Sequence, residues 1–441
     1  MSKYRALIRI ILIAIFSFVA NSFYLMKENL WLIPIVILLF FFVNTFSGFL
    51  DITIKRWRLK ICNHGVECLS VFYMSLIISM IYHIVIIFAL PWDWVSYLLS
   101  ALICAITHTI LFWNGIICVY CTSAQLGIKP RIIGAICGPI PVAHLFALGY
   151  IIYITSREVV EETKKDWLND GRVHLQICKT KYPILLVHGV FFRDSKTLNY
   201  WGRVPAELIK NGATLYYGEH HSASSVEESA LEISEKIKGI IEKYGYEKIN
   251  IIAHSKGGLD CRYAIEKLGI APYIASFTTI NTPHKGCGFA EYVLNKSSEK
   301  LKNKIANTYN KAAKKMGDIN PDFLAAVGDL TESACEKFNA EIPKPEGIYC
   351  QSFGSVLSHA VHGRFPLNFS YPLVKHFDGE NDGLVASDAF AFGESFTLLA
   401  TKGRRGISHA DMIDLNRENI PDFDVREFYV QLVSRLREKG F

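Results

Sequence analysis

The sequence predicts an α-helical N-terminal part followed by a three-layer α/β/α unit with a mostly parallel sheet, and three observations support this prediction. Up to about residue 156, charged residues are scarce and apolar residues run in long blocks. Beyond that residue, charges recur every few positions, and Gly, Pro and Asp punctuate the chain. In this second part, short apolar runs alternate with amphipathic segments, which is typical of strands covered by helices on both faces of a sheet.

Five stretches within residues 1–156 lack Asp, Glu, Lys and Arg over about 17 residues or more. They are 10–26, 29–50, 69–92, 94–128 and 132–156. A membrane-spanning helix needs about 20 apolar residues. A soluble unit of this size has too little polar surface to cover five such segments. We therefore predict a transmembrane helical domain of about five spans, in an integral protein of the cell membrane.

The basic residues of this part are distributed unevenly between its loops. About nine Lys and Arg lie in the N-terminal tail and in the loops after the second and fourth stretches, whereas Lys27 is alone in the other loops. Because Lys and Arg resist translocation, this bias predicts a cytoplasmic N-terminus. With five spans, the C-terminal unit then lies outside the cytoplasm. Alternatively, the stretch 132–156, which contains Pro139 and Pro141, is re-entrant and the C-terminal unit is cytoplasmic.

Charge and cysteine content exclude other classes of protein. The net charge of +6 comes from the apolar N-terminal part, because acidic and basic residues are nearly balanced beyond residue 156. Nucleic-acid binding needs a basic patch on a folded domain, so we expect no nucleic-acid partner. The five cysteines beyond residue 156 form no CxxC pair and no Cys/His cluster at zinc spacing, which favours free structural thiols.

The second part of the chain begins with a charged helical linker, 157–180, and continues as one α/β unit, 181–441. The expected strands are 183–188, 214–217, 248–254, 274–280, 347–353 and 395–399. The clearest expected helices are 226–244, 425–439 and one that follows the third strand directly. The segment 287–343 breaks the alternation with two or three helices, and we predict that it forms a lid over the site.

The segment Ala253-His254-Ser255-Lys256-Gly257 matches the pattern small-x-Ser-x-Gly between an expected strand and an expected helix. Such a turn holds the serine in a strained conformation, so the residues two before and two after it must be small. Ala253 and Gly257 meet this requirement. The turn lifts the Ser255 hydroxyl off the sheet and places the next backbone N–H at a helix N-terminus, where an anion is favoured. Ser255 is therefore predicted to be the nucleophile of a serine hydrolase.

A second loop, His188-Gly189-Val190, follows the first clear strand. In a fold with this kind of turn, the loop at that place supplies the other N–H group that binds the oxyanion. We predict the backbone N–H groups of Val190 and Lys256 as the two donors. His188 precedes the nucleophile, whereas the chain order in this fold is Ser, acid, His, so we assign His188 a structural role.

Chain order also limits the choice of the catalytic base. The histidines that follow Ser255 are His284, His359, His362, His376 and His409. His284 follows the serine's strand too closely for an acid to intervene, and no Asp at a strand end precedes His359 and His362. His409 lies in a loop before a helix-like segment, as a catalytic base requires, and is the predicted base.

Three aspartates compete as the catalytic acid, namely Asp378, Asp382 and Asp388. The turn at Asp382-Gly383 directly precedes an apolar pair of residues. That position at a turn favours Asp382 over the other two.

Four segments, PILLVHGVFFRD, NIIAHSKGGLDCRYAI, TTINTPHKG and ENDGLV, together resemble the bacterial triacylglycerol lipases. The resemblance covers about residues 181–415 and leaves out the apolar N-terminal part. It implies an α/β-hydrolase fold, Asp382 as the acid, His409 as the base, and a lid that coincides with 287–343. Some of these lipases hold a structural calcium ion near the catalytic histidine, and the resemblance implies Asp411 as one ligand.

The predicted function is hydrolysis of lipid-like carboxylic esters by a membrane-anchored enzyme that needs no cofactor. Ser255 attacks the ester carbonyl, His409 takes its proton and Asp382 orients the imidazole. Acyl transfer to an acceptor other than water would use the same three residues. A non-catalytic membrane protein with a degenerate hydrolase domain is the third hypothesis, and the complete Ser, Asp and His set argues against it.

Overall fold

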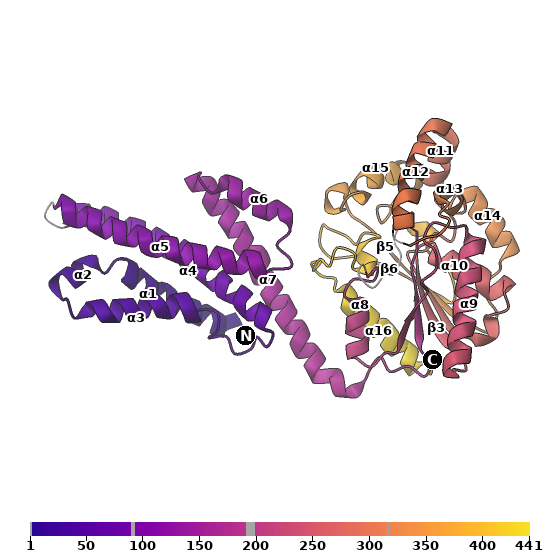
Figure 1. Ribbon diagram of the computed structural model, residues 1–441, viewed down its shortest axis with the longest axis horizontal. Coiled ribbons are helices and arrows are strands. Elements are labelled where there is room, and N and C mark those ends of the chain that lie inside the picture. The colour runs from indigo at the N-terminus through magenta and orange to yellow at the C-terminus, as the bar shows by residue number, and fades with distance from the viewer. Residues whose placement is uncertain (1, 90–92, 191–198, 316) are drawn as a thin grey trace. The chain divides into compact units, whose positions relative to one another are not determined.

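The computed structural model describes residues 2–89, 93–190, 199–315 and 317–441 (Figure 1). The chain divides into two compact units, residues 1–170 and 171–441. Most of the charged segment predicted as a linker belongs to helix α7 (Pro141–Arg172), which continues without a break from the last apolar stretch.

The described part of the first unit is entirely helical. Its helices are α1 (Ser2–Ala20), α2 (Phe23–Glu28), α3 (Leu32–Phe46), α4 (Trp57–Ala89), α5 (Trp94–Thr122), α6 (Ile128–Cys137) and α7. Two of them, α4 and α5, are long and apolar enough to cross a membrane. They correspond to the third and fourth predicted stretches. Helix α3, from the second stretch, is apolar but has 15 residues.

Ion pairs gather the basic segments of the first unit at one end. Glu158 in α7 accepts hydrogen bonds from Arg58 at the start of α4 (2.7 Å) and from the amide of Ala124 after α5 (3.0 Å). Arg5 in α1 pairs with Asp51, in the loop that precedes α4. The N-terminal tail and the loops after α3 and α5 therefore lie together beside the charged half of α7.

The other loops meet at the opposite end. Lys27, in α2, contacts Ser96 (2.7 Å) and Asp93 (3.4 Å) at the start of α5. Figure 1 shows α2 and the N-terminus at opposite ends of the unit. Four of the first five helices, α1, α3, α4 and α5, therefore each lead from one end of the unit to the other, and the short helix α2 lies at the end opposite the N-terminus.

The fifth apolar stretch, 132–156, is divided between α6 and the start of α7. Arg131 in α6 donates hydrogen bonds to the carbonyls of Tyr120 (2.7 Å) and Ser123 (3.1 Å), so α6 starts at the basic end. Helix α6 then stops before Pro139, and α7 leads back to Glu158 at the same end. Pro139 and Pro141 carry no backbone N–H and cannot donate the hydrogen bonds that would continue the helix, which explains the break.

The second unit contains a six-stranded parallel sheet in the order β2-β1-β3-β4-β5-β6. The strands are β1 (Ile184–Val187), β2 (Leu215–Tyr217), β3 (Ile249–His254), β4 (Ile274–Ile280), β5 (Tyr349–Ser355) and β6 (Ser395–Leu399). All six lie where the sequence predicted strands. Strands β1, β3 and β4 are completely buried, as expected for central strands covered on both faces.

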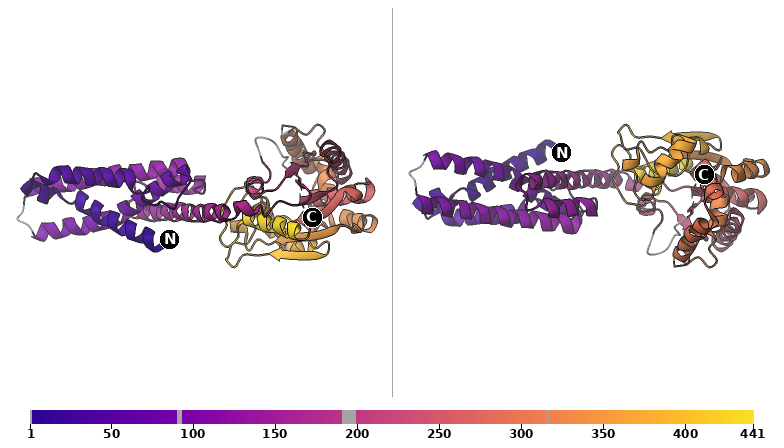
Figure 2. Two further views of the ribbon diagram at one scale, coloured as in Figure 1. Left: turned by 90° about the horizontal axis from the view of Figure 1, so that it is seen from below. Right: turned by 90° about the horizontal axis from the view of Figure 1, so that it is seen from above.

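Helices cover both faces of this sheet (Figures 1 and 2). Helices α8 (Val204–Lys210) and α16 (Val425–Glu438) pack on one face, and α9 (Val226–Tyr244) and α10 (Gly257–Lys267) pack on the other. Helix α9 has the bounds that its periodicity predicted, and Ser225 and Glu228 cap it reciprocally. The predicted three-layer α/β/α architecture is therefore confirmed.

The insert after β4 contains four helices, where the sequence predicted two or three. They are α11 (Gly288–Lys296), α12 (Glu299–Lys315), α13 (Phe323–Gly328) and α14 (Glu332–Glu341). A further helix, α15 (Leu367–Asp378), follows β5 and leads to the loop that holds Asp382. The assignment of this insert as a lid stays a prediction.

Candidate active site

Ser255 occupies a strained turn between β3 and α10. Its φ angle is +56°, in the left-handed region that residues other than glycine rarely adopt. The Ser255 amide donates a hydrogen bond to the carbonyl of Ile280 at the end of β4 (2.9 Å), and the Ser255 carbonyl accepts one from Gly258 (3.0 Å). These bonds hold the backbone in the strained conformation that a nucleophile elbow requires.

The neighbouring glycines allow two loops to approach each other closely. A Cβ atom at Gly257 would lie 2.3 Å from the carbonyl oxygen of His188, and one at Gly189 would lie 2.6 Å from the Cβ of Ser255. Real side chains do not tolerate such distances, so both positions require glycine. The loop after β1 therefore lies directly against the nucleophile elbow, as the sequence predicted for an oxyanion loop.

The carboxylate of Asp382 contacts the imidazole of His409. Asp382 Oδ2 lies 2.6 Å from His409 Nδ1, and both residues are buried. The other oxygen, Oδ1, accepts hydrogen bonds from the amides of Leu384 (2.9 Å) and Val385 (2.8 Å). Asn281, at the end of β4, donates to Oδ2 (2.5 Å). Four donors thus fix the carboxylate, which in turn fixes the ring of His409.

The competing candidates for acid and base lie elsewhere. Asp378 accepts a hydrogen bond from the amide of Phe289 at the start of α11 (3.1 Å). Burial raises the pKa of the Asp378 carboxyl. His284 is buried against Thr279 and Arg262. Among the described residues, Asp382 is the only one of the three candidate aspartates that contacts His409.

His409 lies beside the elbow. Its ring centroid is 4.5 Å from that of His254, the residue before Ser255. His409 bonds through Nδ1 to Asp382, and in the described part of the structure no hydrogen bond joins its Nε2 to the Ser255 hydroxyl.

The two predicted oxyanion donors come from two segments, the elbow itself and the loop after β1. Lys256 directly precedes α10, and Val190 follows the buried strand β1 and Gly189. Within the described part of the chain, neither amide donates a hydrogen bond to another backbone group. The rest of the upstream motif, residues 191–194, lies outside the described residues.

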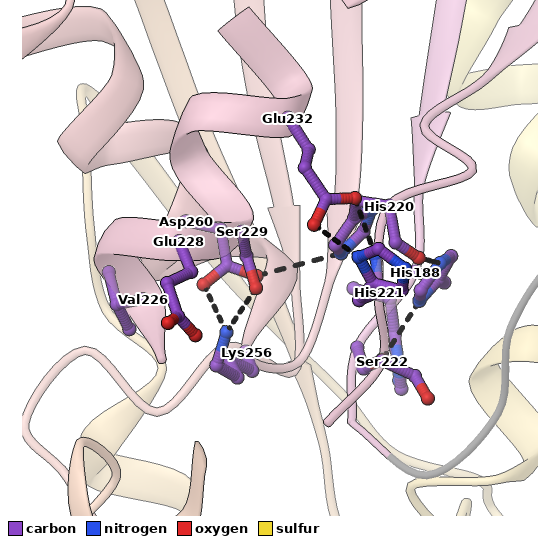
Figure 3. Close-up of polar contacts among 12 residues, drawn as sticks. His188, His220, His221, Ser222, Val226, Glu228, Ser229, Glu232, Lys256 and Asp260 are labelled. Carbon is purple, nitrogen blue, oxygen red and sulfur yellow. Dashed lines mark hydrogen bonds and ion pairs between the residues drawn. The ribbon is translucent and has the colours of Figure 1, made fainter. Parts of the chain in front are cut away.

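The side chain of Lys256 is anchored away from the turn (Figure 3). Its ammonium lies 2.6 Å from Asp260 and donates to the hydroxyl of Ser229 in α9 (3.0 Å). Burial raises the pKa of Asp260 to about 7, and Lys256 opposes this rise. The pair joins α9 to α10 and fixes the residue that follows the nucleophile.

His188 has the structural surroundings that the sequence predicted for it. Its ring stacks on that of His220 at 3.9 Å, and Nε2 lies 3.1 Å from the His220 carbonyl oxygen (Figure 3). Its Nδ1 lies 2.9 Å from the carbonyl oxygen of Gly189. That carbonyl belongs to the same peptide group as the Val190 N–H, so His188 orients this group.

The surroundings of Asp411 do not fit a calcium site. Its carboxylate pairs with the guanidinium of Arg405 (2.7 Å) and accepts a hydrogen bond from the Ser408 amide (2.8 Å). A positive guanidinium at that distance opposes a cation, and calcium needs six or more oxygen ligands. Across the described ranges no group of three His, Cys, Asp or Glu side chains could hold a metal ion.

Sequence reasoning missed two residues of this region, Asn281 and Tyr200. Asn281 has φ +48° and binds the carboxylate of Asp382, which lies 101 positions later in the chain. Tyr200 contacts Gly189 and His254, the residues that precede Val190 and Ser255. The motif TTINTPHKG contains Asn281, but a polar residue after a buried strand does not reveal its partner.

Parts of the chain are similar to known esterases and lipases. The family model described as "Putative serine esterase (DUF676)" matches residues 219–317. A triacylglycerol lipase of Pseudarthrobacter phenanthrenivorans is 29% identical over 177 residues, which make up 37% of this chain and 54% of that protein. A triacylglycerol lipase of Vibrio cholerae is 27% identical over 290 residues, 59% of this chain and 89% of that protein.

Among solved structures, the mature lipase BlEst2 of Bacillus licheniformis aligns with 58% of this chain and 92% of its own, with 21% identity and a TM-score of 0.43. The chain spans about half the length of two curated relatives, the lipases of P. phenanthrenivorans (54%) and Burkholderia plantarii (49%). The residues matched by the family model include Ser255 and the whole of β3 and α10. The second unit, which has a parallel-sheet α/β fold, is thus similar in sequence to proteins named triacylglycerol lipases and, over residues 219–317, to a family model of serine esterases.

Proposed function

We propose that the second unit hydrolyses carboxylic esters with Ser255 as nucleophile, His409 as general base and Asp382 as the group that orients the base. The observation that carries this proposal is the 2.6 Å contact between Asp382 and His409 beside a serine with φ +56°. A strained serine, an oriented imidazole and a buried carboxylate are the three parts of an acyl-transfer site.

The reaction follows from this arrangement. Ser255 Oγ attacks the ester carbonyl while Nε2 of His409 takes its proton. Asp382 accepts the Nδ1–H of the ring, which keeps Nε2 free to act as the base, and stabilises the imidazolium that forms. The amides of Val190 and Lys256 bind the oxyanion. His409 then returns the proton to the leaving alcohol, and water hydrolyses the acyl-enzyme by the reverse sequence of proton transfers.

We propose lipid esters such as acylglycerols as the substrates. Relatives that match over 290 and 266 residues are named triacylglycerol lipases, and the four motifs of the catalytic unit resemble that family. The helical insert 287–343 would cover the site as a lid. The first unit supports the same class of substrate, because two of its helices are apolar and long enough to span a bilayer.

A phosphonate probe tests the nucleophile. A fluorophosphonate is expected to label the wild-type protein once, on the tryptic peptide that contains Ser255, and to abolish hydrolysis of p-nitrophenyl butyrate in proportion to labelling. The probe forms a stable tetrahedral adduct only with a serine activated by a neighbouring base. Mass spectrometry of the labelled peptide gives the position. A label on any other serine, or hydrolysis that persists in the fully labelled protein, would assign the nucleophile elsewhere.

We further propose that the first unit anchors the enzyme in the membrane with both its N-terminus and the catalytic unit on the cytoplasmic side. All basic segments gather at one end of the unit, and Lys27 is alone at the other. Lys and Arg are retained on the cytoplasmic side of bilayers. Because the fifth stretch returns to the basic end, the chain leaves the first unit there, which differs from the external placement that five spans implied.

Reporter fusions distinguish the two placements. Green fluorescent protein, which does not fluoresce when it is exported unfolded, is expected to fluoresce when it is fused after Phe441 of the full chain. Alkaline phosphatase, which needs the oxidising side of the membrane, is expected to stay inactive at the same position. As a matched control, an epitope inserted after Lys27 should be detected on intact spheroplasts. An active phosphatase fusion at Phe441 would restore the external placement.

A further inference from the structure

The hydroxyl of Tyr200 connects two segments that meet at the site. It accepts a hydrogen bond from the backbone N–H of Gly189 (3.0 Å) and lies 2.7 Å from Nδ1 of His254. Tyr200 is buried, and its ring also packs against the rings of His188 and His254. The hydroxyl therefore joins the end of β1 to the end of β3.

The hydroxyl of Tyr200 accepts one hydrogen bond and shares a second with His254. The Gly189 amide can only donate, so the Tyr200 oxygen is the acceptor of that bond. Between Tyr200 and Nδ1 of His254, the tautomer of the ring decides which atom is the donor. Burial, reinforced by the neighbouring His409, lowers the pKa of His254 well below its usual range, which keeps the ring neutral.

The residues that Tyr200 contacts each adjoin a group with a role in the proposed reaction. Gly189 precedes Val190, whose N–H is one proposed oxyanion donor. His254 precedes Ser255, and its ring packs on the ring of His409 at 4.5 Å. The Tyr200 hydroxyl thus contacts the residue before Val190 and the residue before Ser255. Through the ring of His254 it is also linked to His409.

We propose that Tyr200 is a positioning residue that sets the distance between the oxyanion donors and the nucleophile. This inference rests on the proposed ester hydrolysis. Oxyanion donors act only at about 2.7–3.1 Å from the developing charge, and a displacement of about 1 Å can lower the rate by about 100-fold. Without the hydroxyl, the loop after β1 and the His254 side chain of the elbow lose the group that bridges them.

The test compares Tyr200→Phe with the wild type on p-nitrophenyl butyrate. The kcat per active site, counted by fluorophosphonate titration, is expected to fall about 10- to 100-fold with KM within about twofold, because the lost interaction acts on the transition state. The inhibition constant of a trifluoromethyl ketone, whose tetrahedral adduct places an oxyanion in the same hole, should rise in parallel. A purely structural role would change the number of titrated sites and leave both values per site unchanged.

Tyr429→Phe is the matched control. Tyr429 is as buried as Tyr200, it packs on Trp201, and its hydroxyl has no hydrogen-bond partner among the described residues. This variant should keep the wild-type kcat. A second variant, His254→Phe, removes the ring that shares a hydrogen bond with the Tyr200 hydroxyl, and the double variant should lose no more activity than the more severe single variant.

The outcomes separate this inference from the proposed function. Wild-type kcat and inhibitor affinity in Tyr200→Phe, in an enzyme that is labelled at Ser255, would overturn the positioning role alone. The same holds if the losses of Tyr200→Phe and His254→Phe multiply in the double variant. A wild-type protein that is neither labelled nor active would overturn the ester hydrolysis itself.

Discussion

Ser255→Ala is expected to lower kcat for p-nitrophenyl ester hydrolysis by about 10⁵-fold or more, because loss of the nucleophile removes the whole covalent route. The melting temperature should stay close to that of the wild type. The Ser255 hydroxyl makes no hydrogen bond to a described residue, and its amide and carbonyl bonds to Ile280 and Gly258 involve only the backbone. Steady-state kinetics and thermal unfolding of the purified full chain measure the two effects.

A serine outside the site gives the matched control. Ser434 lies on the exposed side of α16 and bonds only to Glu438 (3.3 Å) among the described residues. Ser434→Ala should therefore retain wild-type kcat. If Ser255→Ala keeps more than about a tenth of the wild-type kcat, the serine is not the nucleophile, because removal of a nucleophile leaves only the small rate that binding and the oxyanion donors supply.

Much of the fold could be predicted because its signals are local. The buried strands β1, β3 and β4 are short apolar runs, and α9 shows a helical apolar period between a capping box and Gly245. The insert was harder to read. Helix α12 is strongly charged, and α13 has only six residues, so neither is marked by a long apolar stripe. The number of helices there was consequently underestimated.

The path of the fifth apolar stretch could not be read from hydropathy. Composition shows that a segment is apolar, but it does not show where the segment ends in space. The contacts of Glu158 with Arg58 and Ala124 decide this, and these residues are separated by 100 and 34 positions in the chain. Such pairing depends on the packing of helices, which a tally of charges in loops does not contain.

The strained turn at Ser255 could be predicted from the sequence, whereas the residues that surround it could not. The elbow around Ser255 needs small residues at fixed spacing, so the local sequence is nearly sufficient to predict this turn. Asn281 and Tyr200 depend on contacts across 101 and 54 positions. The choice of the catalytic acid is intermediate in difficulty. Asp378 and Asp382 are only four residues apart, and their contacts in the folded chain are what distinguishes them.

Asp382→Asn is expected to lower kcat by about 10³- to 10⁴-fold, because an amide cannot hold the His409 ring in the tautomer that keeps Nε2 unprotonated. The substitution is also expected to lower the stability of the protein. The carboxylate accepts hydrogen bonds from Asn281, Leu384 and Val385, so an amide NH₂ in its place would face one of these donors. We therefore expect a lower melting temperature as well, which kcat per titrated site separates from the catalytic loss.

Asp378→Asn is the matched comparison for this prediction. Asp378 accepts a hydrogen bond from the amide of Phe289 at the start of α11. An asparagine side chain can also accept that bond, so kcat should change by less than about tenfold. His409→Ala should match or exceed the loss in Asp382→Asn, because acid and base act as one unit. A severe loss in Asp378→Asn combined with a mild one in Asp382→Asn would transfer the acid to Asp378 and contradict the role inferred from the 2.6 Å contact with His409.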